Sequence, residues 1–292
     1  MLGRWWRFFK EVGSQISHDQ VTRLAAALAF YAILSLAPLM VVVLAVVGAM
    51  WGAAAAQGEL LARVQDLVGQ QGAEVFRTVI ASAGGGRQQG VMAIVGVGAM
   101  LLAATAVFAQ LQDSLNIVWS VRPKPGRGWW IYLRRRLLSL AVILLLGALL
   151  LCSLLATAAV SVVSATVARE VPGGYLLWRL INIALTLAVF STLFAVLFKV
   201  LPDAAIAWRD AWLGGALTAA LFTIGKELLA MYLSRAAVGS AYGAAGSLVI
   251  LLVWIYYSAI MLFVGAEVTE VAARRFGRGV WPKANAVITR EA

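Results

Sequence analysis

Six long apolar runs constrain the fold of this chain more than any other feature of its sequence. About 20 apolar residues in a helix cross the hydrocarbon core of a bilayer. The runs cover 24–50, 91–110, 137–168, 180–198, 212–233 and 247–265. The chain is 62% hydrophobic and only 13% charged, which is far more apolar than a soluble domain. We therefore predict an all-α integral membrane protein with six transmembrane helices.

The distribution of Lys and Arg predicts the orientation of these spans. The N-terminal segment, the second and fourth loops and the C-terminal tail together carry 17 of the 24 basic residues, whereas the opposite side carries 6. Because cytoplasmic loops are rich in Lys and Arg, we expect both termini in the cytoplasm, as an even number of spans requires. The sequence then divides into a cytoplasmic segment over 1–23, a membrane domain over 24–270 and a basic cytoplasmic tail over 271–292.

The same count explains the net charge of +11. Most of the basic residues lie at predicted cytoplasmic membrane borders, where anionic lipid headgroups attract them. We therefore expect membrane lipids as partners and no nucleic acid. Small residues such as Ala25, Ala29 and Ala32 permit tight helix contacts within or between chains. The sequence therefore allows an oligomer but does not determine its size.

The segment Gly52–Gly90 between the first two spans has apolar residues near the helical period. This pattern predicts an amphipathic helical segment on the extracytoplasmic side, which caps the bundle or acts as a binding lid.

Polar residues inside or beside spans are the candidate functional residues, because polar groups are costly in hydrocarbon. Gln110, Asp113 and Asn116 lie at i, i+3 and i+6, close to one helix face. In the predicted topology four further charged residues lie at that level: Asp19, Arg23, Glu267 and Glu270. We interpret Asp113, Asn116 and Glu267 as a cytoplasmic polar gate. The alternative is a network of ion pairs and hydrogen bonds that only holds helices together.

Three further features favour transport without deciding it. Lys226 and Glu227 are adjacent, about 100° apart on a helix, so we expect that they do not face one another and that each has its own partner inside the membrane or extends to the extracytoplasmic surface, which Lys226 is near enough to reach. The functional alternative is that one of them lines a hydrated cavity. Pro38 lies in the middle of the first span, where it removes a helical hydrogen bond and predicts a kink that could act as a hinge. Glycines before the sixth span suggest an irregular entry of the kind found at transporter sites.

Motifs for catalysis or metal binding are absent from the sequence. It holds one histidine, His18, one cysteine, Cys152, and no His-Glu-x-x-His or Gly-x-Ser-x-Gly motif. We therefore expect no enzyme activity, no cofactor and no metal.

Two long segments resemble the YihY/virulence factor BrkB family. They are DQVTRLAAALAFYAILSLAP over Asp19–Pro38 and YGAAGSLVILLVWIYYSAIMLFVGAE over Tyr242–Glu267. Leu115–Trp119, and Pro202 with Trp208 and Gly214, fit as well, so the resemblance covers roughly residues 15–270. It implies a six-helix bacterial inner-membrane protein linked to envelope integrity, with transport or lipid handling as the expected role. Members have also been labelled ribonuclease BN, an activity that the single histidine and the missing metal ligands argue against.

Three hypotheses follow from these observations. The first is a transporter or lipid translocator that moves a small solute, an ion or a lipid. The second is a non-catalytic scaffold that organises envelope machinery. The third, a membrane enzyme, is the weakest because the motifs are missing.

Overall fold

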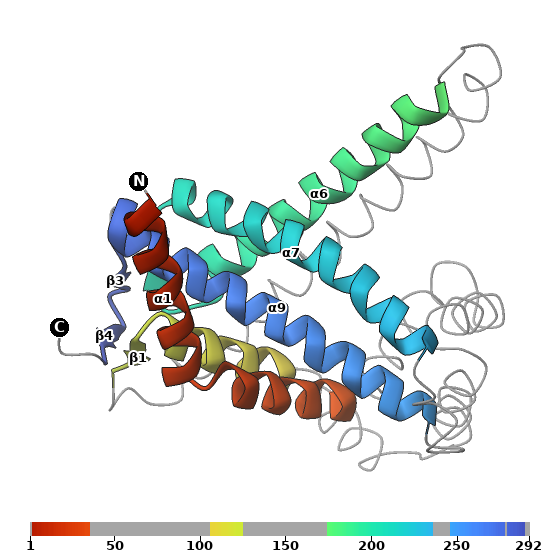
Figure 1. Ribbon diagram of the computed structural model, residues 1–292. Helices are drawn as coiled ribbons and strands as arrows, with labels where there is room; N and C mark the ends of the chain where they lie inside the picture. Colours follow the sequence, from red (N-terminus) through yellow and green to blue (C-terminus); the bar gives the residue numbers. More distant parts are fainter. Residues whose placement is uncertain (1, 36–105, 125–173, 236–245, 278, 290–292) are drawn as a thin grey trace, which may run out of the picture. The chain divides into compact units, whose positions relative to one another are not determined.

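The computed structural model describes residues 2–35, 106–124, 174–235, 246–277 and 279–289 (Figure 1). The chain divides into two compact units. The first comprises Met1–Val21, Gln112–Gly225 and Met261–Ala292, and the second comprises Thr22–Leu111 and Lys226–Ile260. The residues that form the candidate site belong to the first unit.

The described elements are mostly helices. They are α1 (Leu2–His18), a helix over Val21–Ser35, a helical segment over 106–118, α6 (Gly174–Val200), α7 (Trp208–Arg235) and α9 (Gly246–Phe276). Three predicted spans, 180–198, 212–233 and 247–265, therefore lie within helices α6, α7 and α9. The helix over Val21–Ser35 covers the beginning of the first predicted span. Pro38, the segment Gly52–Gly90 and the span 137–168 lie outside the described residues.

Two of the described helices are long and apolar enough to cross a membrane. They are Ile183–Val200 in α6 and Leu248–Phe276 in α9. The helix α7 is less apolar because it also carries Arg209, Asp210, Lys226 and Glu227.

Aromatic rings and small residues pack α6 against α7. The rings of Phe190 and Phe194 lie 5.2 Å and 5.8 Å from the ring of Phe222. At Gly215 a methyl group would lie 2.6 Å from the Ser191 carbonyl oxygen, closer than real contacts permit. The two helices therefore approach backbone to backbone at this level.

The N-terminal segment, predicted only as a charged cytoplasmic tail, is the helix α1. Its Phe8 and Val12, one helical turn apart, pack with Val271 near the end of α9. Figure 1 shows α1 beside that end of α9. This spacing places both apolar side chains on one helix face, so α1 docks on the unit through an apolar stripe.

The described residues are mostly helical, as the all-α prediction expects, but two short antiparallel sheets are also present. Strand β1 (Val121–Pro123) pairs with β4 (Ala286–Ile288), and β2 (Ala204–Ala205) pairs with β3 (Trp281–Pro282). The C-terminal tail is thereby joined to both loops that the charge count places on the same side as the tail. Isolated two-stranded sheets this short have little stability of their own, so the helices that flank them must supply it.

Candidate functional site

Two glutamates near the end of α9 are buried where solvent would be expected to reach a charged side chain. Glu267 is 0% exposed and Glu270 is 4% exposed. The contact of α7 lies on a different face of α9, since methyl groups added at Gly214 and Gly265 would overlap Thr269 and Thr218, respectively, and Glu267 lies two positions, or about half a turn, from both Gly265 and Thr269. Carboxylates so buried are unusual unless they are paired or functional. The end of α9 is therefore the centre of the candidate site.

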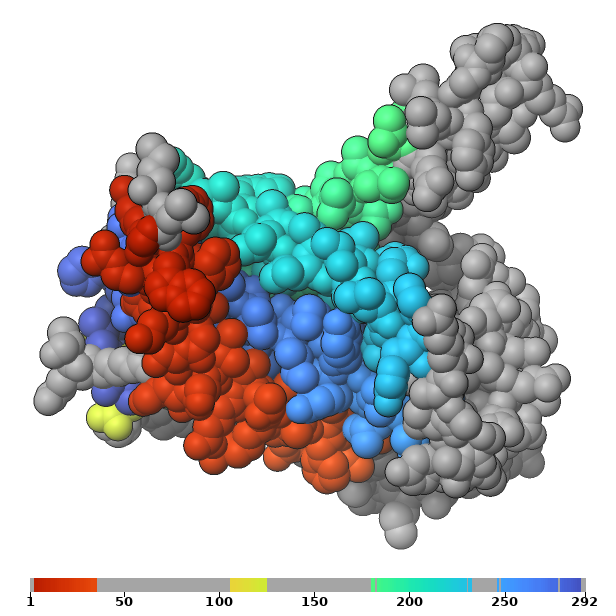
Figure 2. All heavy atoms as spheres, viewed as in Figure 1, coloured from red at the N-terminus to blue at the C-terminus, as the bar shows by residue number. Residues whose placement is uncertain are grey.

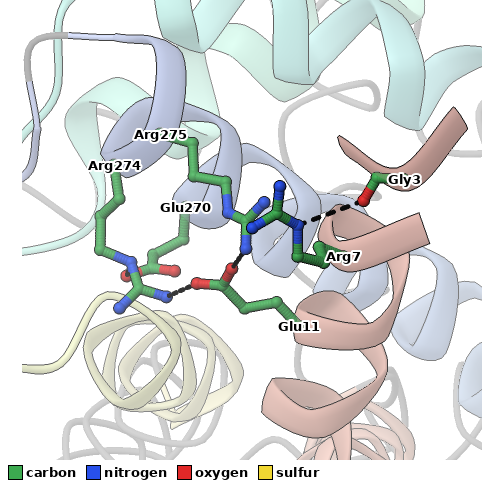
Figure 3. Close-up of polar contacts among 6 residues, drawn as sticks. All are labelled: Gly3, Arg7, Glu11, Glu270, Arg274 and Arg275. Atoms are coloured by element: carbon green, nitrogen blue, oxygen red, sulfur yellow. Dashed lines mark hydrogen bonds and ion pairs between the residues drawn. The ribbon is translucent and has the colours of Figure 1, made fainter. Parts of the chain in front are cut away.

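Arginines on α9 connect Glu270 to α1 (Figure 3). The Arg274 Nε lies 2.9 Å from the Glu270 Oε1, and the Arg274 Nη2 lies 3.3 Å from the Glu11 Oε1. Arg275 forms a second ion pair with Glu11, as the dashed lines in Figure 3 show. Arg274 is 38% exposed, so solvent weakens its pairing with Glu11. These contacts orient Glu270 and attach α1.

A cavity of about 480 Å³ lies beside this network. Glu11, His18, Glu270, Arg274 and Trp119 are among its lining residues. The Trp119 side chain is 2% exposed, and within the described part of the chain its Nε1 has no hydrogen-bond partner. The His18 Nδ1 lies 2.7 Å from the Asp19 Oδ1 at the same end of α1. The cavity thus combines ionisable groups with a buried indole donor, an arrangement that suits a polar occupant such as water, an ion or a polar group of a solute.

Asn116, one of the three predicted gate residues, is held by two hydrogen bonds. Its Nδ2 donates to the Asp203 Oδ2 at 3.0 Å, and its Oδ1 accepts from the Asp203 backbone N at 2.8 Å. Asn116 is 4% exposed, so the bonds are shielded from solvent. They join the helical segment over 106–118 to the loop after α6. Asn116 therefore holds two elements together, as the alternative interpretation of the polar cluster predicts.

One lysine, Lys283, ties the C-terminal tail to the end of α6. The Lys283 Nζ donates to the Pro202 carbonyl at 2.6 Å and to the Val200 carbonyl at 3.2 Å. A cation at the C-terminal end of a helix is favourable because the last carbonyls there lack partners. Burial lowers the pKa of Lys283, while Asp203 acts in the opposite direction and Lys199 in the same direction.

The remaining predicted site residues are placed differently from one another. Asp113 is exposed, whereas Glu267 is fully buried. The expectation that Lys226 and Glu227 do not face one another is wrong: the Lys226 Nζ lies 3.7 Å from the Glu227 Oε1. Both side chains are long enough to bend toward each other, and the Glu227 side chain is 73% exposed. A role of this pair in contacting a transported ion stays a prediction.

Metal-ligand geometry is not found in the described ranges, which contain no group of three or more His, Cys, Asp or Glu side chains arranged to hold an ion. The residues that sequence reasoning missed are Glu11, Trp119, Asp203, Arg274 and Lys283. Most of the partners that the described residues show for them lie far away along the chain; Asn116 and Asp203, for example, are separated by 87 positions, although Arg274 also pairs with Glu270 four positions earlier. Only Glu11 had a local signal, since it lies on the polar side of the α1 stripe.

A family model described as virulence factor BrkB matches residues 12–287. Relatives named "UPF0761 membrane protein" include one from Verminephrobacter eiseniae, 32% identical over 86% of this chain and 58% of its own length. Another, from Photobacterium profundum, is 29% identical over 89% of this chain and 79% of its own length. This chain therefore spans less than two thirds of the length of the first of these relatives. These names describe membrane proteins and state no catalytic activity. No solved structure matches the chain.

Proposed function

We propose, from the premise that this chain belongs to the virulence factor BrkB family of membrane proteins, that it is a transporter or lipid translocator of the bacterial inner membrane. In this role it moves a lipid, a small solute or an ion and supports envelope integrity. The observation that carries the proposal is the burial of Glu267, 0% exposed on a helix apolar enough to cross a membrane. Such residues commonly belong to substrate or ion pathways.

The neighbouring groups support the same role. Glu270 lies three positions further along α9 and lines the 480 Å³ cavity. This arrangement puts an ionisable side chain at the edge of a space large enough for a small polar species. We propose that Glu267 and Asp113 contribute to a cytoplasmic gate, and that Asn116 fixes the helix that carries Asp113. Membrane lipids are the proposed partners, and the topology with six spans and both termini in the cytoplasm is part of the proposal.

The test is translocation by purified protein in liposomes that carry headgroup-labelled phospholipid, with parallel measurements of ion and solute flux. We expect wild type to exceed empty-vesicle leakage, and Glu267→Gln to be folded but slow. Glu291→Gln makes the same chemical change near the end of the tail and controls for loss of charge. Wild-type protein that moves none of these species contradicts the proposal.

A second function, a non-catalytic scaffold of envelope machinery, is favoured by a specific observation. The bonds of Asn116 with Asp203 and of Glu11 with Arg274 join separate elements, as expected for groups that serve only stability. A scaffold predicts that Glu267→Gln lowers folded yield and phenotype together, with no flux from wild type. A transporter predicts a folded, inactive variant.

A further inference from the structure

An apolar groove of about 600 Å³ lies between α1, α7 and α9 in the first unit. In Figure 2, α9 (blue) is visible between α1 (red) and α7 (cyan). Two rows of side chains line its length: Leu213, Leu217 and Leu221 on α7, and Val264, Val268 and Ala272 on α9. The three leucines recur every fourth residue, so they follow one face for about 12 Å at 1.5 Å per residue. The groove therefore offers a continuous apolar surface along α7 and α9, which suits a hydrocarbon chain.

Close contacts between α7 and α9 form its floor. Gly214 approaches Thr269, and one turn further Gly265 approaches Thr218. At the next level, a methyl group on Gly277 would lie 2.5 Å from the Asp210 Oδ2. Residue numbers rise along α7 as they fall along α9, so the helices are antiparallel and the start of α7 lies against the end of α9.

That end of the groove is charged, unlike the rest of its length. Arg209 and Asp210 both line it. The Asp210 Oδ2 is buried, and no described residue forms a hydrogen bond with it. Across the same end, the Arg4 guanidinium lies 5.0 Å from the ring centroid of Phe276, which also lines the groove. In the described part of the chain, the buried Asp210 Oδ2 thus has no hydrogen-bond donor, and it lies at the end of the groove that Arg209 and Phe276 also line.

We propose that this groove binds a phospholipid whose headgroup carries a primary ammonium, such as phosphatidylethanolamine. One acyl chain lies along the leucine row, Arg209 donates to the phosphate, and the Asp210 carboxylate accepts hydrogen bonds from the ammonium group. Charge complementarity selects this occupant: the phosphate pairs with the arginine, and a primary ammonium gives the Asp210 carboxylate both a counter-charge and N–H donors, whereas phosphatidylglycerol offers only neutral hydroxyl donors and phosphatidylcholine offers no N–H donor. The inference rests on the proposed function in naming this lipid as the class that is moved, while binding can be tested by itself.

The test is native mass spectrometry of the purified full chain with phosphatidylethanolamine, phosphatidylglycerol and phosphatidylcholine that carry identical acyl chains. We expect wild type to prefer phosphatidylethanolamine. Asp210→Asn should weaken the binding of phosphatidylethanolamine by about tenfold, the effect of losing one charge-assisted hydrogen bond. The binding of phosphatidylglycerol should not change. Leu217→Trp fills the groove and should weaken the binding of all three lipids. Ile224→Trp introduces the same ring on α7 outside the groove lining and should bind like wild type.

The outcomes separate this inference from the proposed function. Equal binding of the three lipids, or full binding by folded Leu217→Trp, overturns the lipid site. A second copy of the chain or a partner helix displaced by Leu217→Trp, without lipid release, also overturns it. Phospholipid movement in liposomes that Leu217→Trp does not alter leaves the proposed function standing and overturns the groove as its path. Should Leu217→Trp fail to fold, Leu213→Trp makes the same test at a side chain that is 63% exposed.

Discussion

At the scale of single residues, Asn116 has well-defined contacts that predict a measurable effect. Replacement by Ala removes both bonds to Asp203 and leaves the Asp203 backbone N and Oδ2 without these partners. Because the site is buried, we expect a loss of about 2 kcal/mol in stability. Thermal unfolding in detergent measures this loss. Ile117→Ala, at an exposed neighbouring position, is the matched control, and an Asn116→Ala variant that unfolds like wild type contradicts the structural role.

Lys283 gives a pH dependence with a definite sign. Its pKa is lowered from 10.5 mainly because burial disfavours its charged form, while Asp203 raises it and Lys199 lowers it. Between the lowered pKa and 10.5 the unfolded chain binds more protons than the folded chain, so stability rises with pH across that window. We therefore expect wild type to gain stability relative to Lys283→Met as pH increases toward 10.5. Unfolding midpoints for both proteins at several alkaline pH values measure this, and parallel curves contradict it.

At the scale of elements, α1 is held by apolar packing more than by its ion pairs. Phe8 is 5% exposed and packs with Val12 and Val271, whereas the ion pairs of Glu11 involve arginines that are 31% and 38% exposed. We expect Phe8→Ala to cost about 3 kcal/mol and Glu11→Gln less than about 1 kcal/mol. Hydrogen exchange of the amides in 2–18 measures the difference. Equal exchange in both variants contradicts this order.

The same helix illustrates what sequence patterns indicate and what they miss. The apolar runs of α6, α7 and α9 identified these helices, because a span must be continuous and uncharged at its centre. For α1 the sequence predicts only a charged tail, because basic residues dominate this segment, although Phe8 and Val12 have helical spacing. Strands β1 to β4 carry only two or three residues each, too few for any alternating pattern to appear.

At the scale of the whole molecule, long-range contacts determine the candidate site. Glu267 and Glu270 were recognised as candidates because they follow an apolar run. Their burial cannot be predicted from the sequence, since it depends on which elements pack around the end of α9. In the same way, Lys283 contacts carbonyl groups more than 80 positions earlier in the chain. Helical periodicity describes one element at a time and contains no information about which elements meet.

The contacts of the first unit lead to a prediction about topology. The helix α1, β1, β2 and the C-terminal strands are joined by packing and pairing, so segments that the charge count assigns to the cytoplasm must share one side. We expect Ser17→Cys and Ala284→Cys, each in a Cys152→Ser background, to react with a membrane-impermeant maleimide only when the inner face of the membrane is accessible. Gln88→Cys, in the predicted extracytoplasmic loop, should react in intact spheroplasts. Labelling of Ser17→Cys and Ala284→Cys from opposite faces contradicts both the even number of spans and the packing of α1 on α9.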